Sequence, residues 1–111
     1  MPKKARPAKN VKGSKDFWAS LHVLDKSSDE YKTIDEALSL LKANVTSGTH
    51  IQKERWPRKY VREYGINNLY KYDLSSGRRL TYIIVGEDDG CSVIVLDYFR
   101  THKEYEEFFG Y

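Results

Sequence analysis

Residues 68–98 read NLYKYDLSSGRRLTYIIVGEDDGCSVIVLDY, and this stretch decides the fold. Three runs rich in β-branched and aromatic residues, 68–74, 79–85 and 91–98, are separated by the short turn sequences SSG and EDDG. Such runs are typical of strands, and turns this tight join antiparallel neighbours. The sequence therefore predicts a three-stranded antiparallel meander.

Two helical patterns precede the meander. Apolar residues recur at helical spacing over residues 29–44, directly after Ser28, whose hydroxyl is suited to capping a helix. A shorter helix is expected over residues 57–64. Pro57 suits the first helical position, and Gly65 suits the left-handed residue that follows a helix end.

Two further elements complete the predicted order. Residues 17–24, FWASLHVL, have the length and apolar content of a strand. Thr101 and Glu104 have the spacing of a capping box, which predicts a last helix. The expected order is β-α-α-β-β-β-α. This is a single α+β domain over residues 16–111, with an antiparallel sheet, two helices packed on one face and the other face partly open.

The first fifteen residues, MPKKARPAKNVKGSK, differ in character from the rest of the chain. They hold six Lys or Arg and no acid, whereas the whole chain of 111 residues has a formal net charge of +3. A segment so poor in apolar side chains cannot offset its ordering entropy. We therefore expect residues 1–15 to form a disordered basic arm, whose removal would leave folding intact while weakening affinity for a polyanion.

Several classes of protein are made improbable by what the sequence lacks. A single cysteine, Cys91, excludes an internal disulfide and a cysteine-built metal site. The three histidines are scattered without carboxylates at ligand spacing, so no metal or other cofactor is expected. No apolar run approaches membrane-spanning length, and no secretory signal pattern is seen. We expect a cytoplasmic protein with no membrane partner.

Basic and aromatic residues are interleaved over residues 50–79. This segment holds eight Lys or Arg against three acids, together with five aromatic rings, at Trp56, Tyr60, Tyr64, Tyr70 and Tyr72. Basic groups neutralise phosphates, and flat rings give unstacked bases a stacking partner. The pattern predicts a nucleic-acid surface. The alternative is a solvated helix face whose aromatic rings belong to the core.

In its order of elements and in several phrases, the chain resembles the RelE/ParE superfamily of toxin–antitoxin toxins, and in particular the RelE-like members. The phrases are GTHIQK (48–53), WP…Y…YG (56–65), NLYKYDL (68–74), RLTY (79–82) and HKEY…FFGY (102–111). The resemblance covers roughly residues 17–111. It implies a RelE-like fold and a metal-free endoribonuclease, an mRNA interferase, that cuts messenger RNA, often on the ribosome. The ribose 2′-hydroxyl would attack the adjacent phosphate. It also implies a cognate acidic antitoxin as partner.

The resemblance points to three catalytic candidates. Arg79 stands where the family carries an arginine facing the RNA, and its guanidinium would grip the scissile phosphate; the alternative is an ion pair with Asp73 or Glu87. His102 would transfer a proton, or else is an exposed helix residue. Tyr105, one turn further along the same predicted helix face, would contact a base or the phosphate, or else packs on the sheet.

Lys53, Arg55 and Arg58 are the predicted RNA-binding residues. Lys53 and Arg55 alternate in a segment that is expected to be extended, so they would share one side, and Arg58 would add a contact from the helix start. For each of them the alternative is a solvated charge.

Two other functions remain open at this level. One is a non-catalytic relative closer to the ParE branch, which binds nucleic acid or inhibits gyrase, because no Glu is clearly placed among the basic residues. The other is a partner-binding domain whose open sheet face docks an antitoxin or another protein.

Overall fold

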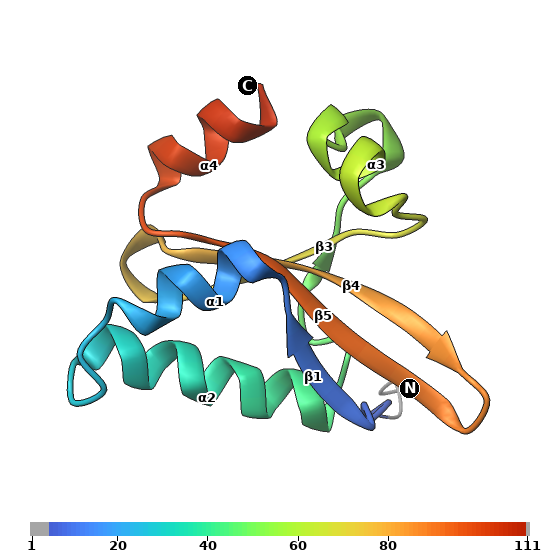
Figure 1. Cartoon of the computed structure of the whole chain (residues 1–111), viewed down its shortest axis with the longest axis horizontal. Helices are drawn as coiled ribbons and strands as arrows, with labels where there is room; N and C mark the ends of the chain where they lie inside the picture. Colours follow the sequence, from blue (N-terminus) through green and yellow to red (C-terminus); the bar gives the residue numbers. More distant parts are fainter. Residues whose placement is uncertain (1–4, 111) are drawn as a thin grey trace.

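The computed structural model describes residues 5–110, and its strands form one mixed sheet of five strands in the order β1-β5-β4-β3-β2 (Figure 1). The strands are β1 (Asn10–Gly13), β2 (Thr49–His50), β3 (Tyr70–Asp73), β4 (Arg79–Glu87) and β5 (Gly90–Phe99). The helices are α1 (Lys15–His22), α2 (Asp29–Ala43), α3 (Arg58–Tyr64) and α4 (His102–Phe109), with 3-10 turns η1 (Lys53–Arg55) and η2 (Ser75–Gly77). The predicted α+β class is confirmed.

The predicted meander is confirmed as antiparallel pairing of β3 with β4 and of β4 with β5. Thr81 pairs with Asp97 while Tyr82 pairs with Val95, so Leu96 is the extra residue of a β-bulge. A bulge changes which residues of a strand share a face. Val93 and Val95, before the bulge, therefore face the first core, whereas Phe99, an even number of residues further on, faces the second.

The prediction of a disordered arm over residues 1–15 is wrong for the part that the structure describes. Asn10–Gly13 forms β1, which pairs in parallel with β5, and Ala8 is buried with its N–H donating to the Lys42 carbonyl oxygen at 2.8 Å. The backbone partners come from β5, far away in the sequence, so local composition could not reveal them. Residues 1–4 lie outside the described part.

The strand expected over residues 17–24 is also wrong, since α1 occupies most of this segment. Ser14 caps α1 by accepting a hydrogen bond from the Phe17 N–H at 3.0 Å. Phe17 and Leu21 are one helical turn apart and both are buried, whereas Val23, which follows the helix, is 82% exposed. The helical spacing of these apolar side chains prevailed over the strand-like composition.

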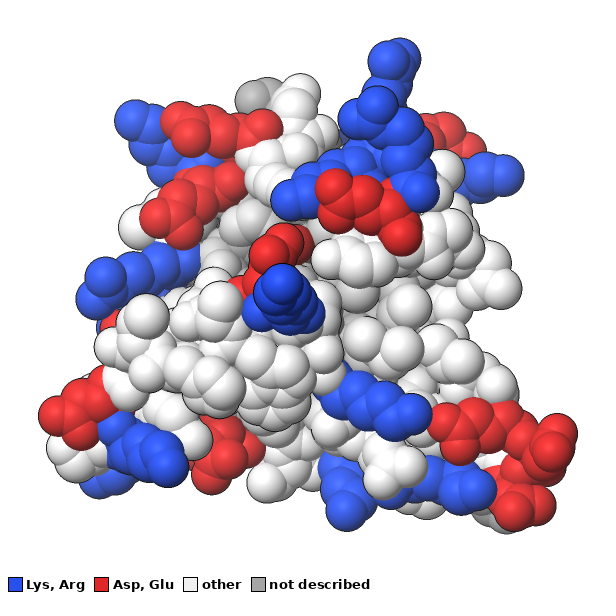
Figure 2. Space-filling model, in the orientation of Figure 1, with Lys and Arg blue, Asp and Glu red and all other residues white. Residues whose placement is uncertain are grey.

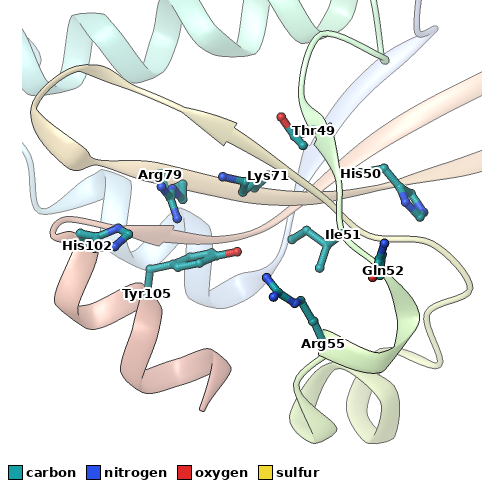
Figure 3. A pocket seen from close by; sticks show the side chains of 9 residues that line it. All are labelled: Thr49, His50, Ile51, Gln52, Arg55, Lys71, Arg79, His102 and Tyr105. Carbon is teal, nitrogen blue, oxygen red and sulfur yellow. The ribbon is translucent and has the colours of Figure 1, made fainter. Parts of the chain in front are cut away.

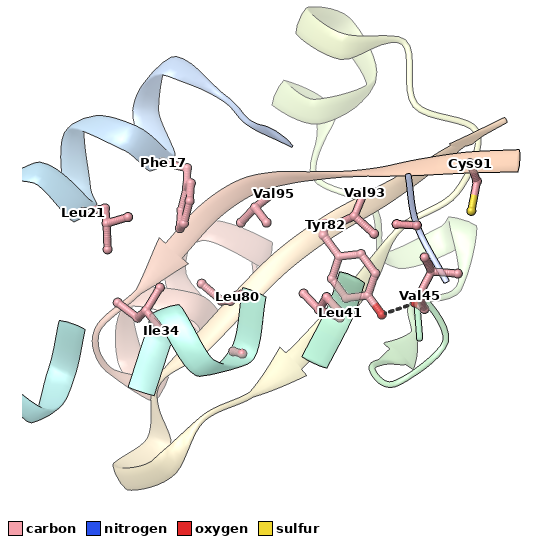
Figure 4. Close-up of a cluster of buried hydrophobic side chains, with 12 residues drawn as sticks. Phe17, Leu21, Ile34, Leu41, Val45, Leu80, Tyr82, Cys91, Val93 and Val95 are labelled. Carbon is pink, nitrogen blue, oxygen red and sulfur yellow. Dashed lines mark hydrogen bonds between the residues drawn. The ribbon is translucent and has the colours of Figure 1, made fainter. Parts of the chain in front are cut away.

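Two separate cores lie on opposite faces of the sheet. The first lies under α1 and α2 and contains Phe17, Leu21, Ile34, Leu41, Val45, Leu80, Tyr82, Val93 and Val95 (Figure 4). The second lies under α3 and α4 and contains Ile51, Tyr60, Ile66, Leu69, Ile83, Leu96, Phe99, Tyr105 and Phe109. α2 thus shares its face of the sheet with α1, and not with α3 as expected. The other face, expected to be partly open, is partly covered by α3 and α4.

The start of β2 is fixed by a single buried tyrosine. The Tyr82 hydroxyl donates to the Val45 carbonyl oxygen at 2.8 Å (Figure 4) and accepts from the Gly48 N–H at 3.0 Å. Tyr82 is fully buried, so both bonds are made away from water. They hold the chain that leads from α2 into the functional site described below.

None of the helices within residues 5–110 combines the length and the apolar character needed to cross a lipid bilayer.

Candidate functional site

A cavity of about 540 Å³ opens on the α3/α4 face of the sheet (Figure 3). Its walls come from β2 and the loop after it, from β3 and β4, and from α4. The lining residues are Thr49, His50, Ile51, Gln52, Arg55, Lys71, Arg79, His102 and Tyr105. All three predicted catalytic residues and one predicted RNA-binding residue, Arg55, therefore lie around one cavity.

Arg79 forms the part of the wall that comes from the sheet. Its Nε lies 2.7 Å from Asp73 Oδ1, and its Cζ lies 4.4 Å from the centre of the Tyr105 ring. The side chain is 15% exposed, and its Nε–H makes no hydrogen bond of acceptable geometry with any residue of the described chain. Asp73 thus lowers the local charge without saturating the donors of Arg79, which remain suited to an anion.

Lys71 adds a second cation from the neighbouring strand. Asp73 pairs with Arg79 in the β3–β4 register, and Lys71 lies two residues earlier on the same face. Its Nζ lies 3.7 Å from the same Asp73 Oδ1, and the side chain is 24% exposed. One carboxylate therefore faces two cations, and with Arg55 the site carries an excess of positive charge.

His102 is held at the start of α4. The Thr101 hydroxyl accepts from the Glu104 N–H at 3.1 Å, and the Glu104 carboxylate accepts from the Arg100 N–H at 3.0 Å, which confirms the predicted cap. His102 Nε2 lies 2.7 Å from Glu106 Oε1. The side chain is 57% exposed, so the imidazole is oriented by Glu106 and still reaches solvent.

The sequence left open whether Tyr105 contacts the ligand or packs on the sheet, and in the structure its ring packs while its side chain also lines the cavity. Its ring packs on Phe109 at 4.3 Å and edge-on against Phe99 at 5.5 Å, and Arg79 lies over it. The ring lies 6.5 Å from that of His102. Figure 3 shows the hydroxyl pointing into the cavity. The ring is thus committed to protein contacts, and the hydroxyl end of the side chain lies at the cavity wall.

The two other predicted RNA-binding residues, Lys53 and Arg58, do not line the cavity. The expectation that Lys53 and Arg55 share one side of an extended segment is wrong, because Lys53–Arg55 forms the 3-10 turn η1. With three residues per turn, side chains two positions apart point in different directions. Arg58 lines a separate hollow together with Trp56.

Five lining residues were not selected from the sequence: Thr49, His50, Ile51, Gln52 and Lys71. The signal for Lys71 was present, since alternation along the predicted strand places it on the same face as Asp73. For the others there was no local signal. They reach the cavity because β2 pairs with β3, with Thr49 opposite Lys71 and His50 opposite Tyr70.

A buried polar cluster fastens α3 to the sheet beside the cavity. The Tyr60 hydroxyl lies 2.7 Å from both Thr81 Oγ1 and Asp97 Oδ2. Burial raises the pKa of the Asp97 carboxyl, and the hydrogen bond from Tyr60 partly counteracts this. Burial and the nearby Asp97 charge raise the pKa of Tyr60 far above its ordinary value. Tyr60 therefore stays protonated and acts as a donor.

The chemistry available in the cavity is that of an anion site with two imidazoles, those of His50 and His102. None of the nine lining residues is Asp or Glu. Within residues 5–110, no group of three or more His, Cys, Asp or Glu is arranged to hold a metal ion. Cationic donors, an imidazole and a tyrosine hydroxyl are suited to binding a phosphate and moving a proton near it.

Comparison of the chain with protein-family models, with curated proteins and with solved structures gave no match. The interpretation of the site therefore rests on its residues and their geometry.

Proposed function

We propose that this protein is a RelE-like endoribonuclease, the toxin of a type II toxin–antitoxin system, and that it cleaves messenger RNA. The observation that supports the proposal is the convergence of Arg55, Lys71 and Arg79 with His102 and Tyr105 around one cavity. A phosphodiester flanked by a ribose matches this combination. Cations balance the phosphate, and the imidazole and hydroxyl lie within the same cavity.

In the proposed reaction the ribose 2′-hydroxyl attacks the adjacent phosphorus. The bond from phosphorus to the 5′-oxygen breaks, which leaves a 2′,3′-cyclic phosphate and a 5′-hydroxyl. Arg79 and Lys71 stabilise the negative charge that develops on the phosphorane oxygens. His102, whose imidazole reaches solvent, accepts the proton that leaves the 2′-oxygen, and water delivers the proton that the 5′-oxygen takes up. The Tyr105 hydroxyl donates a hydrogen bond to the phosphate.

The test is cleavage of a defined mRNA, free and on programmed ribosomes, by the wild type and by Arg79→Ala. We expect Arg79→Ala to cleave about 100-fold more slowly or worse, because a donor to the transition-state charge is lost. Arg78→Ala is the matched control: Arg78 precedes Arg79 and does not line the cavity. Intact mRNA under both conditions with wild-type protein would overturn the proposal.

A second candidate is a non-catalytic module of the same superfamily that binds nucleic acid or inhibits gyrase. None of the nine lining residues is a carboxylate that could act as a general base, and this favours the non-catalytic candidate. Growth arrest with intact transcripts and broken DNA would select this candidate over the nuclease.

The proposal includes an acidic antitoxin as partner and the cytoplasm as location. Its support is the excess of positive charge around the cavity, which an acidic segment would neutralise. Co-expression with the product of a neighbouring gene for a short acidic chain should give a complex that dissociates at high salt. Arg79→Ala should weaken that complex, whereas Arg78→Ala should not.

A further inference from the structure

A second hollow, of about 300 Å³, lies next to the cavity but shares no lining residue with it. Its walls are Trp56, Arg58, Val61 and Arg62. The two sites are joined through one short loop, since Arg55 lines the cavity and Trp56 lines the hollow. In addition, Trp56 Nε1–H donates to the carbonyl oxygen of Ile51, a cavity residue, at 2.9 Å. A chain leaving the cavity across this loop would enter the hollow.

The hollow carries two cations for which no ion pair is found within residues 5–110. Arg58 and Arg62 are one turn apart on α3, and both are exposed. Within residues 5–110 neither forms an ion pair, whereas their neighbour Lys59 lies 3.7 Å from Asp16. Like charges four residues apart destabilise a helix. Figure 2 shows Lys and Arg side chains over α3 with acidic side chains among them. The two arginines, which have no ion pair of their own in the described part of the chain, are suited to an anionic partner.

The hollow also presents apolar surface between these charges. Val61 is 47% exposed, and Trp56 is only partly buried. The Trp56 N–H is satisfied by the Ile51 carbonyl oxygen and the ring packs against the second core, so the indole is held in a fixed orientation where it lines the hollow. A fixed aromatic ring beside two guanidinium groups matches an unstacked base with its flanking phosphates.

We propose that this hollow is a second nucleotide subsite, which binds single-stranded RNA with a base on Trp56 and the flanking phosphates on Arg58 and Arg62. The inference rests on the proposed function and deepens it. The substrate is then a single strand that extends beyond the two nucleotides flanking the scissile phosphate. Trp56, Arg58 and Arg62 bind this strand and take no part in the reaction.

The experiment compares a dinucleotide with a hexanucleotide, both of 2′-O-methyl RNA, which lacks the attacking hydroxyl. Binding is measured by titration at several salt concentrations. The proteins are the wild type, the double variant Arg58→Ala with Arg62→Ala, and Trp56→Ala. The matched control is Lys32→Ala with Lys42→Ala, which removes two exposed charges from α2 on the opposite face.

We expect the wild type to bind the hexanucleotide more tightly than the dinucleotide. The double arginine variant should lose this advantage and lower the slope of log K against log salt by about 1.4, at about 0.7 for each lost phosphate contact. Trp56→Ala should weaken hexanucleotide binding about tenfold. The α2 control should change neither quantity. Equal affinity for the two oligonucleotides in the wild type would overturn the inference.

A third measurement keeps the inference testable if Trp56→Ala fails to fold. In Trp18→Phe protein, Trp56 is the remaining tryptophan of the two in the chain, and its fluorescence should be quenched by the hexanucleotide but not by the dinucleotide. Quenching by neither would overturn the inference. If Arg79→Ala weakens both oligonucleotides while the double arginine variant weakens neither, the subsite is wrong and the proposed function stands. If no RNA binds at any salt concentration, both are wrong.

Discussion

The guanidinium carbon of Arg79 lies 4.4 Å from the centre of the Tyr105 ring, which joins the first residue of β4 to the first turn of α4. A cation over an aromatic face contributes about 0.5–2 kcal/mol, more when water is excluded. Tyr105 is only 3% exposed, so this contact is largely dry. The position of Arg79 therefore depends on α4 being docked, and the cavity forms only when the helix packs against the sheet.

Substitutions at Tyr105 should separate the ring from the hydroxyl. Tyr105→Phe keeps the ring under Arg79 and removes only the buried hydroxyl, so the free energy of unfolding should fall by no more than about 0.5–1.5 kcal/mol, the net contribution of one hydrogen bond. RNA cleavage should slow about tenfold, because a hydrogen bond to a charged phosphate is lost. Tyr105→Leu should also lower stability by about 1–3 kcal/mol. Denaturant unfolding measures the stability of both variants, and an assay of RNA cleavage measures their activity. An unchanged cleavage rate in Tyr105→Phe would show that Tyr105 only holds Arg79 in position and does not contact the RNA.

Asp73→Asn should strengthen the binding of RNA. Asp73 Oδ1 lies 2.7 Å from Arg79 Nε and 3.7 Å from Lys71 Nζ, and the carboxylate side chain is 57% exposed. Removing its charge leaves both cations to the ligand, and the cost in stability should stay below about 1 kcal/mol. Affinity measured at low salt should rise up to about fivefold, and the gain should shrink as salt is added. Weaker binding would show that Asp73 is needed to orient Arg79.

The stability of the wild type relative to Asp97→Asn should fall as the pH rises. Burial raises the pKa of Asp97 above its ordinary value of 3.8, so the native state holds this proton more tightly than the unfolded chain. The contribution of Asp97 is therefore fully present below pH 3.8 and is lost as the pH passes through the native pKa. Denaturant unfolding of both proteins from about pH 3 to 7 measures the difference. A difference that grows with pH would contradict the assignment.

Gly48→Ala should destabilise the protein by about 1–3 kcal/mol, the usual cost of forcing an extra methyl group into a packed site. A Cβ at this position would collide with the Lys71 carbonyl oxygen and lie 2.5 Å from the Tyr82 hydroxyl. Gly86→Ala is the control, because a Cβ there meets no atom within 4 Å. Thermal unfolding should distinguish the two, and equal melting temperatures would argue against this close approach.

Deleting residues 1–13 should lower the melting temperature by about 10 °C or more, since it removes the β1 pairing with β5 and the buried Ala8. The control keeps the strand and removes its charge: Lys9→Ala with Lys12→Ala breaks only exposed ion pairs, those of Lys9 with Glu87 and Asp89. This control should melt within a few degrees of the wild type. A truncated protein that melts normally would restore the interpretation of the segment as an arm.

The parts of the fold that sequence reasoning predicted correctly are those specified by neighbours in the chain. The meander follows from alternation and short turns, and Gly65 ends α3 at φ 56° as its position indicated. The β1 strand has no such signal, because four residues at an edge find their partner in β5. In α1 the composition suggested a strand, while the spacing of Phe17 and Leu21 and the Ser14 cap determined a helix.

The residues of the candidate site also fall into two groups, those that the sequence indicated and those that only the structure revealed. The resemblance to a known superfamily indicated Arg79, His102 and Tyr105, and the structure brings all three to one cavity. Pairwise geometry across strands was needed to find Thr49 and His50, since their positions depend on the β2–β3 register. The 3-10 turn over Lys53–Arg55 determines that Arg55 and not Lys53 reaches the cavity, and sequence spacing alone could not predict this.

The parallel pairing of β1 with β5 has a consequence for the order of events during synthesis. Ser14 Oγ donates to the Leu96 carbonyl oxygen, a contact that spans 82 positions of the chain. Contacts of high sequence separation slow folding, because the entropy of closing the loop is lost before the contact forms. While the ribosome is still translating the middle of the message, α1 and α2 lack the strands they pack on. Apolar side chains such as Phe17 and Ile34 then remain available to chaperones until β5 emerges.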